Sequence, residues 1–123
     1  AFSSGAMLLW PQVIKGMGSG TLNPTGAVQL INREKAVVID VSETEEFAKG
    51  HVGGSKNLPL GQLEAQLPNV VKNKGLPVIL VCPTGTRSGR ALATAKKLGY
   101  EKAQSLSGGL AAWRQANLPV EKA

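Results

Sequence analysis

The sequence contains few cysteine, histidine and aromatic side chains, and each shortage excludes a class of protein. One cysteine in 123 residues, Cys82, rules out an intramolecular disulfide framework and a zinc site built from several thiolates. One histidine, His51, and no HExxH or Cys/His cluster leave zinc without support. We therefore expect no metal ion. A lone thiol fits a reducing compartment, which predicts a cytoplasmic protein.

The sequence also lacks an apolar run long enough to cross a membrane. Residues 6–14 (AMLLWPQVI) are apolar apart from Pro11 and Gln12, whereas a spanning helix needs about 20 apolar residues. We interpret residues 1–20 as a flexible leader or as the end of a membrane anchor, with a signal-peptide remnant as the alternative. If an anchor precedes the domain, Lys15, Arg33 and Lys35 place the domain at the inner face of the plasma membrane.

The remaining composition is that of one globular domain. Hydrophobic residues make up 42% and charged residues 18% of the chain, and no fixed-period repeat is visible. Fourteen Lys and Arg against eight Asp and Glu give a net charge of +6, which favours anionic partners. The basic residues are scattered and only five aromatic side chains are available for stacking, so we expect small anions and no nucleic acid. We expect a monomer.

Two apolar runs predict the centre of a parallel sheet. Residues 36–41 (AVVIDV) and 78–82 (VILVC) are apolar on both faces, which is typical of strands covered by helices on each side. Further short strands are predicted over 56–58 and 103–106. Helices are predicted over 24–34 with Asn23 as the cap, 43–49, 60–71 with a break at Pro68, 87–98 and 109–117. The alternation predicts an α/β protein with mainly parallel strands.

The candidate site is the loop of residues 82–88 (CPTGTRS), between a buried strand and a helix. Ligands of open α/β sheets bind beyond the carboxyl ends of the strands. The positive helix N-terminus and the cation of Arg87 both favour the thiolate form of Cys82. Gly85 lets the loop curl its amides inward as an anion cradle, to which Pro83 contributes no donor. The alternative is that Cys82 is a small buried hydrophobe.

Ser88 has two possible partners in this loop. It can cap the following helix or form a hydrogen bond with the sulfur, and we favour capping.

Four segments, in order, resemble the single-domain rhodanese-like sulfurtransferases over residues 22–119. They are 38–41 (VIDV), 46–59 (EFAKGHVGGSKNLP), 82–88 (CPTGTRS) and 106–113 (LSGGLAAW). The resemblance implies a three-layer rhodanese-like fold over residues 21–123, with a five-stranded, mainly parallel sheet flanked by helices.

The resemblance also implies an activity that needs no cofactor. Cys82 would take a sulfane sulfur from a small anionic donor such as thiosulfate, become a persulfide, and pass the sulfur to a thiol or cyanide acceptor. The residues implied for donor binding are Pro83, Thr84, Gly85, Thr86, Arg87 and Ser88.

Other residues of the matched segments are expected to be structural. Asp40 should brace the turns at the end of its strand, His51 should bond within the turn of residues 50–55, and Trp113 should lie in the core. Ser42 departs from the family, whose members often carry Arg after the Asp-Val pair.

Two other functions stay open. Many rhodanese-like domains have lost the cysteine and act as interaction modules, whereas this chain retains Cys82, Gly85 and Arg87. The phosphatases and arsenate reductases of this fold resemble a pattern with five residues between Cys and Arg, and this chain has four. The shorter loop suits a single sulfur atom better than a phosphate.

Overall fold

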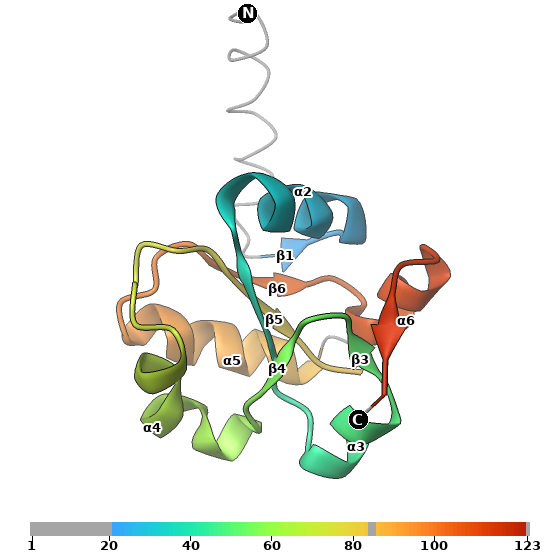
Figure 1. The fold of residues 1–123 in the computed structure, drawn as a ribbon. Coiled ribbons are helices and arrows are strands. Elements are labelled where there is room, and N and C mark those ends of the chain that lie inside the picture. The colour runs from blue at the N-terminus through green and yellow to red at the C-terminus, as the bar shows by residue number, and fades with distance from the viewer. Residues whose placement is uncertain (1–20, 84–85, 123) are drawn as a thin grey trace, which may run out of the picture.

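The main sheet of the protein is parallel throughout. The computed structural model describes residues 21–83 and 86–122, so the expectations for residues 1–20, Thr84 and Gly85 lie outside the described residues. Five strands pair in the order β1-β6-β5-β2-β4 (Figure 1), and each neighbouring pair is parallel. The strands are β1 (Thr21–Leu22), β2 (Val37–Asp40), β4 (Lys56–Asn57), β5 (Val78–Val81) and β6 (Ala103–Leu106).

Helices cover both faces of this sheet and divide the core into two halves. Side chains of α4 (Leu60–Val70) and α5 (Thr86–Lys97) pack on one face, and those of α2 (Pro24–Glu34) and α6 (Gly109–Gln115) pack on the other. Strand β5 contributes to both halves because alternate side chains point to opposite faces. Val78 and Leu80 face α4 and α5, whereas Ile79 and Val81 face α2 and α6. The predicted five-stranded α/β fold is confirmed.

A second, two-stranded sheet was not predicted. Strand β3 (His51–Val52) pairs antiparallel with β7 (Val120–Glu121). Each strand has only two residues, too few for an alternating pattern to show in the sequence. This sheet joins the segment after α3 (Thr44–Lys49) to the end of the described chain.

Most predicted elements agree with the structure to within two residues at each end. Asn23 caps α2 as predicted, because its side chain accepts the Gly26 N–H at 2.7 Å. The predicted break at Pro68 is wrong, since α4 continues through this proline to Val70. Proline removes one helical hydrogen bond, but Leu63 and Leu67 are fully buried on the same helix and hold it against the sheet.

The end of α4 is also held from the neighbouring connection. The Val71 N–H donates to the Leu67 carbonyl at 2.8 Å, and the buried Tyr100 hydroxyl donates to the Val71 carbonyl at 2.6 Å. The first bond completes the last helical turn, and the second satisfies a carbonyl that has no partner within the helix.

Gly108 makes the turn from β6 into α6, which predicts a strong effect of a side chain there. Its φ is 74°, and an added Cβ would lie 2.7 Å from the Ala112 Cβ. We expect Gly108→Ala to lower the free energy of unfolding by about 1–3 kcal/mol, measured by urea denaturation. The matched control is Gly61→Ala in α4, where the added Cβ meets nothing within 4 Å. This control should be neutral or stabilising, and equal midpoints for the two variants would contradict the prediction.

Candidate active site

Cys82 lies directly after β5, the middle strand of the sheet. Its side chain is 1% exposed and joins the half of the core that α4 and α5 cover. This position, beyond the carboxyl end of a central parallel strand, is where open α/β sheets bind their ligands. The structure therefore places the predicted nucleophile at the expected edge of the sheet.

The first turn of α6 holds the backbone on which Cys82 lies. The Leu110 N–H donates to the Cys82 carbonyl at 2.9 Å, and the Ala111 N–H donates to the Pro83 carbonyl at 3.2 Å. Amides in a first helical turn have no acceptor within the helix, so they are available for such bonds. Helix α6 is itself fixed by Trp113, which is 4% exposed and donates its indole N–H to the Pro119 carbonyl at 2.7 Å. The predicted core role of Trp113 is confirmed.

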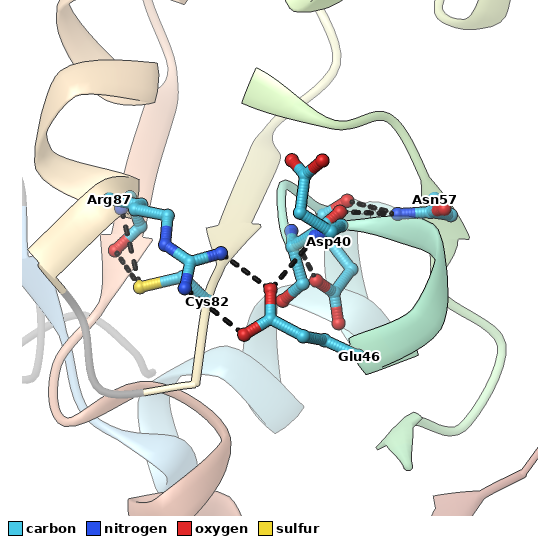
Figure 2. Close-up of polar contacts among 8 residues, drawn as sticks. Asp40, Glu46, Asn57, Cys82 and Arg87 are labelled. Carbon is cyan, nitrogen blue, oxygen red and sulfur yellow. Dashed lines mark hydrogen bonds and ion pairs between the residues drawn. The ribbon is translucent and has the colours of Figure 1, made fainter. Parts of the chain in front are cut away.

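The sulfur of Cys82 contacts the first turn of α5. The Ser88 N–H points at Sγ with a nitrogen–sulfur distance of 3.4 Å, and Ser88 Oγ lies 3.7 Å from Sγ (Figure 2). Because α5 begins at Thr86, Ser88 lies inside the helix, and the favoured capping role was wrong. The structure shows Ser88 in contact with its other predicted partner, the sulfur of Cys82. A donor and the positive end of a helix thus face Sγ.

Arg87 forms an ion pair that the sequence analysis missed. Its Nη1 and Nη2 donate to the two carboxylate oxygens of Glu46 on α3, at 2.6 and 3.1 Å (Figure 2). Glu46 Oε1 also accepts the Glu43 N–H at 3.0 Å, which completes a capping box at the start of α3. Glu45 and Glu46 both lie in an acidic first turn, so the sequence alone gave no reason to choose Glu46 as a partner for Arg87.

The Glu46–Arg87 ion pair determines which charges lie near the sulfur of Cys82. The hydrogen bond from Arg87, assisted by the Glu43 N–H, lowers the pKa of Glu46 from 4.5 to about 2. The same bond raises the pKa of Arg87, and negative charge at Cys82 acts in the same direction. Arg87 is therefore an already paired cation, and not the unopposed one that the sequence analysis expected.

Asp40 and Ser42 close the end of β2. Asp40 is 1% exposed, and its Oδ1 accepts the Ser42 N–H at 2.8 Å. The Asn57 side chain donates to the Ser42 carbonyl at 2.9 Å and to the Asp40 carbonyl at 3.2 Å (Figure 2). Burial raises the pKa of Asp40, and the hydrogen bonds from Ser42 oppose that rise. Asp40 thus makes the bracing contact that was predicted for it.

His51 lies in β3 and bonds to different partners from those predicted. Its ring stacks on Phe47 with centroids 3.7 Å apart, and Nδ1 lies 2.8 Å from the Phe47 carbonyl oxygen. Its Nε2 lies 3.8 Å from a carboxylate oxygen of Glu121 on β7. The expected bond within the turn of residues 50–55 was wrong, and the contacts of His51 join the end of α3 to the small sheet.

The described residues contain neither a cluster of metal-ligating side chains nor a membrane-spanning helix. In residues 21–83 and 86–122, no three His, Cys, Asp or Glu side chains are grouped as metal ligands would be. No helix within these ranges has the length and apolar character needed to cross a membrane. The predicted site residues Thr84 and Gly85, and the side chain of Thr86, lie outside what the structure describes.

The protein is a three-layer α/β protein, in which a parallel five-stranded sheet lies between two layers of helices. A buried cysteine follows the middle strand of this sheet. Residues 23–116 match the family model described as the rhodanese-like domain. The chain belongs to this rhodanese-like family.

Three similar proteins illustrate the range of the family. The chain is 37% identical to the uncharacterized protein slr1261 of Synechocystis over 83% of this chain, but it spans only 56% of that protein. It is 32% identical to the thiosulfate sulfurtransferase GlpE of Pseudomonas putida, over 81% of this chain and 88% of that one. A solved structure of a rhodanese with anions from E. coli has a TM-score of 0.63 at 28% identity, covering 72% of this chain and 99% of that one.

The Glu46–Arg87 pair predicts a loss of stability in acid. Since folding lowers the pKa of Glu46 from 4.5 to about 2, the contribution of the pair is complete above pH 4.5 and disappears as the pH falls toward 2. Side-chain exposures of 41% and 38% allow screening by solvent, so the contribution should be about 0.5–1 kcal/mol.

The measurement is the unfolding free energy in urea for the wild type and Glu46→Gln across this pH range. Glutamine keeps an acceptor for the Glu43 N–H, while it removes the charge and one of the two acceptors for Arg87. The difference between the two proteins should shrink as the pH falls. The raised pKa of Asp40 has the opposite sign, but its largest cause is burial, which both proteins share, and the charge of Glu46 is the last-ranked of its causes. A difference that is independent of pH would contradict the assignment.

Proposed function

We propose that the protein is a sulfurtransferase that carries a sulfane sulfur as a persulfide on Cys82. The observation that supports this most directly is the position of Sγ, at the carboxyl end of β5 and 3.4 Å from the Ser88 nitrogen. The Pseudomonas putida relative, which bears the name thiosulfate sulfurtransferase, supports thiosulfate as a donor. The acceptor would be a thiol or cyanide.

The reaction consists of two displacements at sulfur. The Cys82 thiolate attacks the outer sulfur of thiosulfate, a sulfur–sulfur bond forms, and the original sulfur–sulfur bond breaks as sulfite leaves with the electron pair. The acceptor then attacks the outer sulfur of the persulfide and restores the thiolate. The Ser88 N–H and the positive end of α5 stabilise the negative charge that the sulfur carries in both states.

Arg87 serves in this proposal as the cation that binds the anionic donor. A guanidinium has five N–H groups, and Glu46 accepts from two of them in the described structure. The bidentate pair holds the guanidinium plane in one orientation. We assign the other N–H groups to the oxygens of the donor, so that Glu46 is a positioning residue for Arg87.

The central prediction concerns the mass of the protein after exposure to thiosulfate. The wild type should gain one sulfur atom on intact-mass spectrometry, and cyanide should remove it with formation of thiocyanate. Cys82→Ser should do neither, while its urea midpoint stays near that of the wild type. The control for folding is Ser105→Ala, a substitution of a buried serine elsewhere in the sheet. Sulfur transfer by Cys82→Ser would overturn the assigned nucleophile.

Two further measurements, of partner binding and of phosphatase activity, distinguish the other two functions. A wild type that gains no sulfur from thiosulfate or from a protein persulfide, while still binding a partner, would be an interaction module. Hydrolysis of an aryl phosphate that is lost in Cys82→Ser would indicate phosphatase chemistry.

The role of Arg87 is tested against a neighbouring arginine on the same helix. Arg87→Gln should lower kcat/KM for thiosulfate on the order of 10- to 100-fold, because a hydrogen bond to a charged group is lost. Arg90 is exposed in the same helix, and Arg90→Gln should leave this value unchanged. Equal steady-state values for the two variants would remove Arg87 from donor binding.

A further inference from the structure

The charged side chains of the protein are unevenly distributed. The last turns of α2 and α5, together with the loops that lead into β2, β5 and β6, carry seven lysines and arginines but only two glutamates, Glu34 and Glu101. The rest of the described chain carries six basic and six acidic residues. These last turns and loops are together called the connections before the strands. The excess of positive charge among the described residues therefore lies in these connections. All seven cations are exposed: Arg33 and Lys35 before β2, Lys72 and Lys74 before β5, and Lys96, Lys97 and Lys102 before β6. We call these seven residues the basic face.

The register of the sheet brings these connections to one edge. Val37, Val78 and Ala103 lie opposite one another at the starts of β2, β5 and β6. The connections before β5 and β6 run side by side at the left of Figure 1. Neighbouring strands are about 4.8 Å apart, so the segments that lead into adjacent strands enter the sheet next to one another.

Specific contacts confirm that side chains of different connections meet. Lys74 Nζ lies 5.7 Å from the centre of the Tyr100 ring, which connects the residues before β5 to those before β6. Lys97 Nζ lies 3.7 Å from Glu64, an exposed carboxylate on α4. Glu34, Glu64 and Glu101 together cannot neutralise seven cations, so the basic face keeps a net positive charge.

We propose that the basic face docks on an anionic lipid bilayer. Charges spread over one edge of a domain match an extended anionic surface better than a single small anion. Strand β1 is parallel to β6, so the chain enters β1 from the direction of this edge, although Thr21 itself lies opposite Ser105, the third residue of β6. The sequence upstream of β1 contains the apolar residues 6–14 with Trp10, and tryptophan is enriched at the membrane interface.

Docking in this way leaves the candidate active site facing water. Cys82 lies beyond the carboxyl end of β5, whereas the basic face lies at the amino ends of the strands. Four residues of a parallel strand extend about 13 Å, so the two sites are at opposite edges of the sheet. The proposal does not depend on sulfur transfer and would hold for an interaction module as well.

The test is cosedimentation of the full chain with phosphatidylcholine vesicles, with and without phosphatidylserine. The wild type should bind the anionic vesicles more tightly, and added salt should weaken this binding. The triple variant Lys72→Gln, Lys96→Gln and Lys102→Gln should bind them on the order of 100-fold more weakly, because each lysine near an anionic surface contributes about fivefold.

A matched variant removes three cations from other surfaces. Lys49→Gln, Lys56→Gln and Arg90→Gln change the net charge equally at exposed positions away from the basic face, and should leave vesicle binding unchanged. Both triple variants should keep the urea midpoint of the wild type. Equal loss in the two variants would show that only net charge matters and would overturn the proposal.

Two other outcomes would also overturn it. Wild-type binding that does not distinguish anionic from neutral vesicles would assign the attachment to apolar contacts alone. Binding of the wild type to duplex RNA or DNA, sensitive to the first triple variant and accompanied by no binding to anionic vesicles, would make the basic face a nucleic-acid surface.

Discussion

The carboxyl end of β5 is the point on which the geometry of the candidate site depends. Strands β2 and β6 hold β5 on either side, and the first turn of α6 holds the carbonyls of Cys82 and Pro83 from beyond the strand. The chain then enters α5, whose first turn brings the Ser88 N–H to the sulfur. Because sheet and helices each fix a different part of this path, the position of Sγ is determined by the packed core rather than by the loop alone.

The electrostatics of the site follow from the contact between α3 and α5. Glu46 is held at once by Arg87 and by the Glu43 N–H, so the guanidinium takes its orientation from the start of α3. Pairing with Glu46 offsets much of the positive charge that Arg87 would otherwise present to the sulfur. The amide of Ser88 and the end of α5 therefore carry more of the stabilisation of an anionic sulfur than the sequence analysis assumed.

The elements that the sequence predicts well are those whose cause is local. The β-branched runs of β2 and β5 and the Asn23 cap of α2 are visible in short windows, and so is a lone cysteine after a buried strand. The pairing of β3 with β7 cannot be predicted from short windows of the sequence, because these two-residue strands depend on a partner almost seventy residues away. The Glu46–Arg87 pair and the sulfur contact of Ser88 likewise exist only after α3, β5 and α5 have packed together.

The polarity of a parallel sheet explains why a catalytic edge and a charged edge can coexist in so small a domain. Every strand presents its carboxyl end to one edge and its amino end to the other, so the two sets of connections are separated by the length of the strands. The connections at the carboxyl ends are constrained by the contacts of Cys82, Asp40 and Arg87. Those at the amino ends contribute no contact to the sulfur, and exposed lysines there cost little stability. Charge can therefore accumulate at that edge with little effect on the sulfur, because the cations are exposed to solvent and lie about the length of a strand away from it.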